Sequence, residues 1–216
     1  MSSIADRVSA FNRARKWRYF SRVVPITSAL SVLDVGFSDK EFSGGANYLE
    51  KHYPYPERIT ALGIEEPVEF RVRYPKVKVV RYDGGRFPFA DDAFDIAWSN
   101  AVIEHVGRRD RQLFFLQEMV RVSRMAFLTT PNRRFPVEVH TRTPVLHYLP
   151  KRLFDAYLRA IGKGWAAGEY MHLLGRRDLI SLLRDAGVER YDLIENRLAG
   201  LVLDFVVIIG ERPRTA

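Results

Sequence analysis

The sequence predicts an open α/β fold, in which a mostly parallel β-sheet has helices on both faces. Apolar, strand-like runs alternate with helix-like runs along most of the chain, and this alternation is typical of parallel strands joined by helical crossovers. The first strand-like run ends at a glycine, and a polar, glycine-bearing stretch then leads into a helix. The chain has 216 residues, 47% of them hydrophobic, so it can bury one substantial core. We expect a single domain over residues 1–216.

The hydrophobic pattern also predicts the individual elements. Strands are expected over residues 31–35, 59–64, 77–82, 94–98, 125–129, 190–195 and 201–209. Helices are expected over residues 9–24, 47–51, 101–106, 109–122 and 176–186. The helix over 109–122 is amphipathic, because its apolar residues recur at helical spacing.

Residues 1–24 are expected to form an N-terminal helical extension that ends before Pro25. The extension is strongly basic, with arginine the commonest charged residue. We expect Trp17 and Phe20 to pack on the domain, with the arginines facing solvent or an anionic partner.

The rest of the chain is organised around the stretch from Ser31 to Asp39. A strand-like run stops at Gly36, and the loop continues through Gly44-Gly45. At such a turn backbone N–H groups face a nucleotide-like ligand, and a glycine has no Cβ to keep the ligand away. The later glycines of a G-x-G-x-G pattern are replaced by Ser38 and Lys40, so the backbone cannot approach a ligand closely at every position.

Composition excludes several kinds of chemistry. The chain has no cysteine, which excludes disulfides, iron–sulfur clusters, thiolate zinc sites and thiolate nucleophiles. The N-terminus lacks the apolar region of a signal peptide. The longest apolar run, from Leu198 to Gly210, is broken by Asp204 and is shorter than the ~20 residues of a spanning helix. We therefore expect a cytoplasmic protein without a membrane span.

The formal net charge is +8. The basic residues are spread along the chain rather than gathered in a tail, which favours a solvated basic surface over a nucleic-acid partner. Steeply salt-dependent binding of RNA by the N-terminal helix would favour nucleic acid instead. A homodimer is compatible with the sequence.

Four short motifs follow one another between Val32 and Pro131. They read VLDVG at 32–36, ALGIE at 61–65, YDG at 82–84 with FPFADDAFD at 87–95, and SNAVIEHV at 99–106. Each is degenerate alone, but the four in this order are specific. On these residues the chain resembles the class I S-adenosylmethionine-dependent methyltransferases, in particular their type-11-like branch. The resemblance implies a Rossmann-like sandwich with a seven-stranded sheet whose last strand is antiparallel. It also implies S-adenosylmethionine (SAM) as methyl donor and S-adenosylhomocysteine (SAH) as product.

The resemblance implies roles for side chains at the strand ends. Glu65 would accept both hydrogen bonds from the ribose diol, since a carboxylate offers two acceptor oxygens. Asp83 would accept from the adenine amino group, and Asp34 would organise the glycine turn and, directly or through water, the ammonium of the ligand. The other predicted cofactor residues are Gly36, Phe37, Ser38, Gly84 and Asn100. The alternatives are that Glu65 is a solvated loop charge and that Asp83 only forms the turn before Gly84-Gly85.

The region over residues 130–175 is expected to lie on the substrate side. Prolines at positions 131, 136, 144 and 150 exclude a regular helix or a central strand through its first part, and a connection longer than ~12–15 residues is usually functional. His140 is the first choice for a general base, because an imidazole titrates near neutrality. The predicted substrate contacts are Glu104, His105, Asn132, Glu138, His147 and Tyr148. The alternative is that the histidines satisfy loop carbonyls.

The motifs favour methylation of oxygen. Methylation of base carbons commonly uses a cysteine, and methylation of base amines typically uses an Asn-Pro-Pro-aromatic motif where this chain has Ser99-Asn100-Ala101-Val102. A looser resemblance to small methyltransferases of polysaccharide assembly makes a sugar or oligosaccharide hydroxyl the leading acceptor. The alternatives are a phenolic or quinone-like molecule, a SAM-binding protein without catalysis, and a nucleic-acid-binding protein.

A divalent cation such as magnesium is also compatible with the acceptor side. Glu104, Glu138, His140 and His147 offer oxygen and nitrogen ligands, although their spacing matches no structural zinc pattern. The sequence leaves the identity of a metal open.

Overall fold

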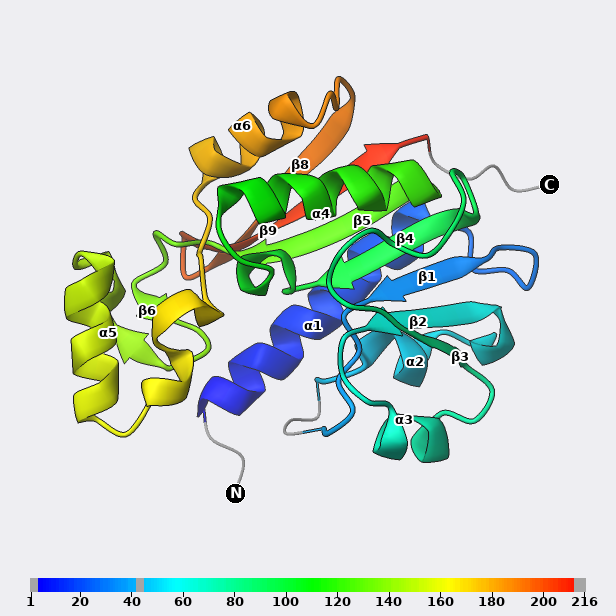
Figure 1. Cartoon of the computed structure of the whole chain (residues 1–216). Coiled ribbons are helices and arrows are strands. Elements are labelled where there is room, and N and C mark those ends of the chain that lie inside the picture. Colours follow the sequence, from blue (N-terminus) through cyan, green and yellow to red (C-terminus); the bar gives the residue numbers. More distant parts are fainter. Residues whose placement is uncertain (1–3, 42–44, 212–216) are drawn as a thin grey trace. The chain divides into compact units, whose positions relative to one another are not determined.

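A computed structural model describes residues 4–41 and 45–211 (Figure 1). Its main sheet has seven strands in the order β3-β2-β1-β4-β5-β9-β8. Their bounds are β1 Val32–Val35, β2 Ile59–Gly63, β3 Lys78–Arg81, β4 Phe94–Asn100, β5 Ser123–Pro131, β8 Tyr191–Leu198 and β9 Leu201–Gly210.

The sheet is mostly parallel, as the sequence predicts. Strand β1 pairs in parallel with β2 and β4, and β2 pairs in parallel with β3. The last two strands, β8 and β9, are antiparallel; Ala199 and Gly200 join them, both with positive φ (49° and 81°), which is the geometry of a tight hairpin turn. The predicted Rossmann-like fold with an antiparallel last strand is confirmed.

The chain divides into two compact units. The first comprises residues up to Ser99 together with 118–127 and the C-terminal residues from Ile209, and the second comprises 100–117 and 128–208. The register within the first unit places the ends of β1, β2 and β3 at one edge, since Val35 pairs with Leu62 and Gly63 with Arg81. The residues that directly follow these strands, among them Gly36, therefore start from the same edge.

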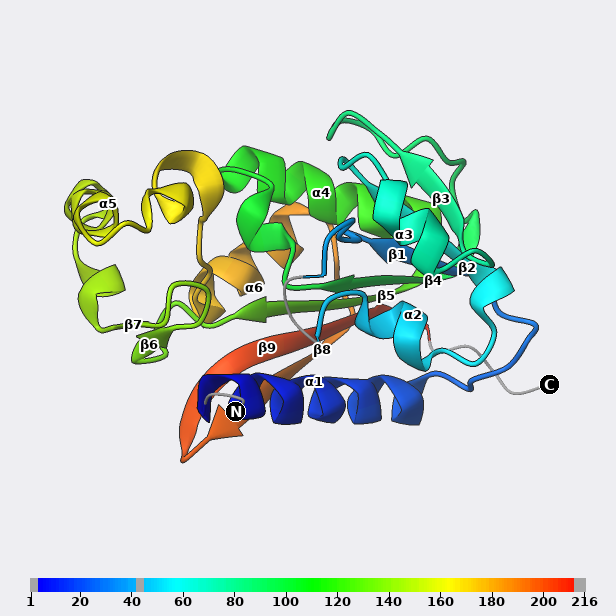
Figure 2. The same cartoon turned by 90° about the horizontal axis from the view of Figure 1, so that it is seen from below.

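The first unit contains helices α1 (Ile4–Val23), α2 (Tyr48–His52) and α3 (Val68–Arg73), and a 3-10 turn, Pro56–Arg58. Figure 2 shows α1 running alongside the strands of this unit as one straight helix. Its Phe20 is completely buried, and the ring lies edge-on to Trp98 at 4.9 Å and to Phe127 at 5.3 Å. Trp17 stacks on Phe20 at 5.4 Å. The predicted packing of Trp17 and Phe20 is confirmed.

The second unit contains α5 (Lys151–Ala160) and α6 (Arg176–Asp185), and the amphipathic helix α4 (Arg109–Val122) begins in it. It also holds a separate two-stranded sheet of β6 (Val137–Glu138) and β7 (Thr143–Pro144). Its 3-10 turns are Ile103–His105, Leu146–Tyr148, Gly164–Ala166 and Gly168–Tyr170. The prolines of 130–150 thus permit only two-residue strands beyond the end of β5.

One predicted helix is wrong. Residues 101–106 form only the 3-10 turn Ile103–His105, because Ala101 has a left-handed φ of 60° and Gly107 a φ of 116°. A regular α-helix cannot include either conformation. No helix within the described ranges combines the length and the apolar character of a transmembrane segment.

Candidate active site

The glycine turn after β1 has the conformation that its sequence requires. Gly36 has a φ of 106°, which favours glycine, and its N–H donates to the carbonyl of Leu62 at 2.8 Å. Phe37 is buried rather than exposed to a ligand. Its ring covers Gly63, where an added Cβ would lie 2.6 Å from Cε1 of Phe37. Phe37 can therefore contact a cofactor only through its backbone.

Asn47 closes the loop in which Ser38 and Lys40 replace glycine. Its side chain accepts from the N–H of Ser38 at 2.9 Å and donates to the Ser38 carbonyl at 2.8 Å. Its own φ is 48°, a conformation that asparagine tolerates better than most residues. This role of Asn47 could not be predicted from its place directly before a helix, since its side chain bonds the loop rather than the N-terminus of α2. Gly44, onto which the loop was expected to close, lies outside the described residues, and Gly45 accepts a hydrogen bond from Arg13 of α1.

Glu65 follows β2 and is fixed by the same loop. Its Oε2 accepts the N–H of Asp39 at 2.7 Å, while Oδ1 of Asp39 accepts the N–H of Phe70 in the first turn of α3 at 2.9 Å. Within the described residues, Oε1 of Glu65 makes no hydrogen bond, and the side chain is exposed. One oxygen therefore orients the carboxylate and the other is available to a ligand hydroxyl.

Asp83 and Gly84 form the turn after β3. Oδ1 of Asp83 accepts the N–H of Gly85 at 2.8 Å, and Gly84 has a φ of 84°. The carboxylate is exposed. Asp83 is thus a turn former, and its second oxygen keeps the capacity to accept a further hydrogen bond.

Asp34 in β1 and Glu50 in α2 form a buried carboxyl pair. Burial, and then the charge of the nearby Glu50, raise the pKa of Asp34 well above its usual range. Burial also raises the pKa of Glu50. Two buried carboxylates close together repel each other, which favours a proton on one member of the pair. Glu50 reads as an ordinary helical glutamate, and no sequence signal identified it.

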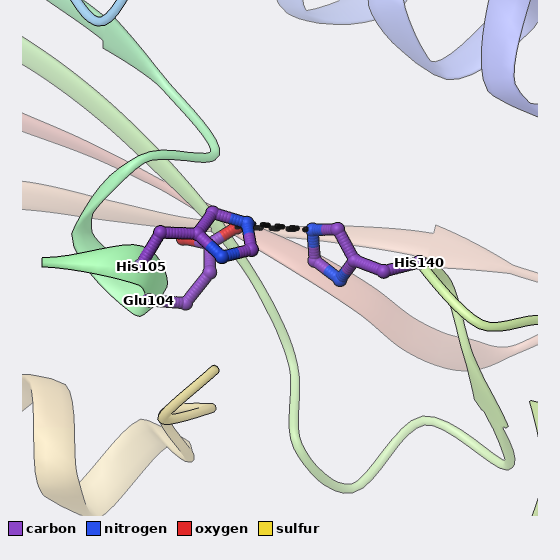
Figure 3. A group of neighbouring side chains, drawn as sticks. All are labelled: Glu104, His105 and His140. Atoms are coloured by element: carbon purple, nitrogen blue, oxygen red, sulfur yellow. Dashed lines mark hydrogen bonds and ion pairs between the residues drawn. The ribbon is translucent and has the colours of Figure 1, made fainter. Parts of the chain in front are cut away.

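A cluster of histidines and carboxylates lies in the second unit (Figure 3). Glu104 and His105 belong to the 3-10 turn after β4, and His140 to the connection between β6 and β7. The Nε2 atoms of His105 and His140 face each other at 3.2 Å. Oε1 of Glu104 lies 3.6 Å from Nε2 of His140 and 4.0 Å from Nε2 of His105. Glu104 is completely buried.

Each histidine of this cluster is oriented by a second partner. Nδ1 of His140 is 2.8 Å from Oε1 of Glu138, and Nδ1 of His105 is 2.9 Å from the carbonyl of Tyr170. Oε2 of Glu104 accepts the hydroxyl of Thr130 at 3.0 Å. The sequence analysis predicted the carboxylates and histidines, but not Thr130 or Tyr170, which become neighbours only through the fold.

Two pKa values in the cluster depart from their ordinary range. Burial alone would raise the pKa of Glu138, but hydrogen bonds from His140 and Thr141 outweigh burial and lower it to about 2. Burial lowers the pKa of His105 against the opposing charge of Glu104. Glu138 is therefore an anion at neutral pH, and His105 is a neutral imidazole.

The other predicted acceptor-side residues lie outside this cluster. Asn132 braces the strand ends, since Nδ2 donates to the carbonyl of Val202 and Oδ1 accepts the N–H of Arg134. Oδ1 of Asn100, predicted at the cofactor, accepts the hydroxyl of Thr129 at 2.7 Å.

His147 and Tyr148 line a separate pocket of about 480 Å³ in the second unit. Nε2 of His147 contacts the carbonyl of Arg133 at 3.0 Å, and the Tyr148 hydroxyl donates to the carbonyl of Arg134 at 2.7 Å. The same pocket is lined by Arg133, Arg134, Lys151 and Phe154. The lining combines these basic and aromatic side chains with apolar residues and with Asp155, which pairs with Lys151.

The comparisons with known proteins agree with this fold. A family model described as a methyltransferase domain, of the type-11 branch, matches residues 33–125. A search of the curated proteins finds no match. A SAM-dependent methyltransferase from Aquifex aeolicus shares 15% identity over 90% of this chain and 88% of its own, with a TM-score of 0.56. One from Mesorhizobium loti shares 16% identity over 89% and 96%, also at 0.56. The N-terminal domain of EvdMO1 with SAH bound shares 18% identity over 93% and 81%, at 0.53.

The sheet order and the glycine turn after β1 are those of the fold that these SAM-dependent methyltransferases share. Residues 33–125 match the methyltransferase domain of the type-11 branch, whose methyl donor is SAM.

Proposed function

We propose that the protein transfers the methyl group of SAM to an oxygen atom, and that the acceptor is a hydroxyl of a sugar or oligosaccharide. The sulfonium of SAM is already an activated electrophile, so the protein has to align the acceptor and remove its proton. An alkyl or sugar hydroxyl needs such help, whereas a phenol needs little.

The Glu138–His140 pair is the observation that carries this proposal. The carboxylate holds Nδ1 of His140 at 2.8 Å, which leaves Nε2 as the basic atom of the ring. Both oxygens of Glu138 also accept backbone N–H groups, from His140 and Thr141, so the carboxylate cannot turn away. A buried carboxylate that orients an imidazole is the arrangement of a general base.

Exposed aromatic side chains in the second unit support a sugar acceptor. Trp165 is 56% exposed and Tyr170 is 41% exposed, and their rings are edge-on at 5.3 Å. Exposed aromatic faces of this kind can stack on sugar rings. We further propose that His105, His147 and Tyr148 contact the acceptor, and that Glu65, Asp83, Asp34, Gly36 and Gly84 contact SAM.

The test is a screen of methyl transfer from labelled SAM to a panel of sugars, oligosaccharides and phenols. With an accepted sugar, His140→Ala should lose ~10²–10⁴ in turnover, the usual worth of a general base, while the affinity for SAM stays unchanged. His52→Ala, which removes an exposed histidine of α2, is the matched control.

A phenolic or quinone-like acceptor is the alternative, and the same screen separates the two. If only phenols are methylated and His140→Ala keeps most of the turnover, the sugar proposal is wrong. If SAM binds but no acceptor of either kind is methylated, a SAM-binding role without O-methyl transfer replaces both.

A further inference from the structure

We propose that Glu104, His105 and His140 form a binding site for a divalent transition-metal ion of the zinc type. Oε1 of Glu104 and the Nε2 atoms of the two histidines converge on one point (Figure 3). The three distances between these atoms are 3.2, 3.6 and 4.0 Å.

The triangle of ligand atoms has the size of a metal site. A point equidistant from the three atoms lies about 2.1 Å from each, which agrees with zinc bonds of ~2.0–2.2 Å to imidazole nitrogen and carboxylate oxygen. An ion therefore fits at this point without a rearrangement of the backbone. Three protein ligands leave at least one coordination position for water or a hydroxyl, as in catalytic zinc sites.

The hydrogen bonds around the triangle leave an electron pair available on each of its three ligand atoms. The carbonyl of Tyr170 can only accept, so Nδ1 of His105 carries the proton. Both oxygens of Glu138 accept N–H groups from the backbone, and the same carboxylate accepts from Nδ1 of His140. In the neutral rings both Nε2 atoms are consequently unprotonated, and they face each other at 3.2 Å. Two such lone pairs repel unless a cation or a proton lies between them.

Glu104 supplies a second, independent observation. Its side chain is 0% exposed, and within the described part of the chain Oε1 makes no hydrogen bond. A buried carboxylate oxygen without a donor costs free energy unless a positive charge is near. Oε2 is held by Thr130, so the orphaned oxygen stays directed at the two histidines.

The donor set selects the kind of ion. Magnesium prefers an octahedral shell of oxygen ligands, whereas imidazole nitrogen suits zinc and its neighbours in the first transition row. The partners of Nδ1, a carboxylate on one ring and a backbone carbonyl on the other, are those that metal-bound histidines use. The structure also brings His105 into the group in place of His147, which contacts the carbonyl of Arg133 instead.

The ion site would serve the proposed O-methyl transfer, and only this role of the ion rests on the proposed function. A bound ion would lower the pKa of an acceptor hydroxyl, whose proton would pass to solvent water, and Nε2 of His140 would then hold the ion instead of accepting that proton. Ion binding itself can be measured without SAM and without an acceptor. Failure to bind an ion would leave the proposed O-methyl transfer with His140 as base, and failure of methyl transfer would leave the ion site intact.

The experiment is a titration of the full chain, stripped of metal with a chelator and dialysed, with zinc chloride by calorimetry and with cobalt(II) by visible absorption. We expect one ion per chain, intense absorption bands of low-coordinate cobalt, and no saturable binding of magnesium at the same concentrations. Glu104→Gln, His105→Gln and His140→Gln should each weaken zinc binding at least 100-fold. Glu138→Gln, which alters only the partner of a ligand, should weaken it ~10–100-fold.

His52→Gln is the control for adventitious binding by an exposed histidine and should bind zinc like the wild type. Circular dichroism checks that each variant is folded. If the variants of the three ligand residues are unfolded, the zinc affinity of Glu138→Gln and the cobalt spectrum of the wild type test the proposal instead. Absence of stoichiometric zinc binding to the wild type would overturn the proposal. Unchanged affinity in folded Glu104→Gln, or in Glu138→Gln, would do the same.

Discussion

One carboxylate oxygen of Glu65 is bound by the protein, and the other is available to a ligand on the exposed side. The N–H of Asp39 holds Oε2, so the carboxylate is oriented before a ligand arrives, and less rotamer freedom is lost on binding. This arrangement gives the predicted ribose contact a physical basis that the sequence alone did not contain.

Glu65→Ala should therefore weaken binding of SAM or SAH about ten- to hundredfold, because a lost hydrogen bond that leaves a partner unsatisfied costs ~1–3 kcal/mol. Calorimetry measures the effect. Glu66→Ala is a matched control, since Glu66 is the next residue and pairs with Arg81 on the surface. Wild-type affinity in both Glu65→Ala and Asp83→Ala would rule out the assigned cofactor contacts.

The buried Asp34–Glu50 pair makes stability depend on pH. The pKa of Asp34 is raised in the folded state, so the folded chain binds this proton more tightly than the unfolded chain. The stabilisation is fully present below the unfolded pKa near 4 and is lost as the pH rises toward the raised value, with a slope of up to about 1.4 kcal/mol per pH unit for one proton.

Asp34→Asn should remove this pH dependence, because the amide donates to Glu50 without a titrating proton. The variant should gain stability relative to the wild type as the pH rises from 4 to neutrality, measured by chemical unfolding at several pH values. Asp92→Asn, at an exposed carboxyl, should follow the wild type. Parallel curves for Asp34→Asn and the wild type would mean that the pair holds no extra proton.

At the residue scale, the sequence predicted the residue types of the site better than their partners. Glu104, His105, Glu138 and His140 were all expected on the acceptor side, but only the fold brings residues 104 and 140 within contact. Asn47 and Glu50 were missed because their roles depend on one backbone conformation and on burial, and neither leaves a mark in the local pattern.

Among the elements, α1 is part of the core of its unit. Phe20 fills a space between Trp98 and Phe127, whereas Phe11 on the same helix is 53% exposed. The helix is basic along its length and still contributes apolar packing, because Phe20 near its C-terminal end is directed into the core.

Phe20→Ala should lower the free energy of unfolding by ~3–5 kcal/mol, as for other buried phenylalanines. Phe11→Ala should change it by less than about 0.5 kcal/mol, because surface substitutions rarely do more. Denaturant unfolding compares the two. Effects below about 0.5 kcal/mol in both variants would mean that α1 is a loosely attached tail, and removal of residues 1–22 would then leave melting unchanged.

The strands and the long helix α4 could be predicted from the sequence, because the apolar residues of each recur without interruption at the spacing of a strand or of a helix. Helix α3 could not, since Val68, Phe70 and Val72 alternate as in a strand while only Phe70 is buried. The helix predicted over 101–106 failed for the opposite reason: its residues suit a helix, but Ala101 and Gly107 have positive φ.

For the whole molecule, the fold class could be predicted because order and spacing of four motifs carry more information than any one of them. The division into two units could not, since no linker marks it. The acceptor side depends on contacts between residues far apart in the chain, which hydrophobic periodicity does not report.

Binding of the cofactor should stabilise the chain. SAH at 100 times its dissociation constant should raise the free energy of unfolding by about 2.7 kcal/mol, which for a chain of this size corresponds to an increase in Tm of about 5–11 °C. Differential scanning fluorimetry measures the shift, with adenosine monophosphate as the control ligand. A shift of the same size with the control, or none with SAH, would contradict specific cofactor binding.

The ring of Phe37 over Gly63 has a consequence for how this chain can change in evolution. A side chain at position 63 would meet Phe37 at 2.6 Å, so Gly63→Ala alone should destabilise the protein by ~1–3 kcal/mol. Phe37→Ala removes the three atoms nearest to a side chain at position 63, so the double variant should be more stable than the two separate losses add up to. The order of substitutions is then constrained: a lineage must shrink residue 37 before it can enlarge residue 63, and descendants with a large residue at both positions should not survive.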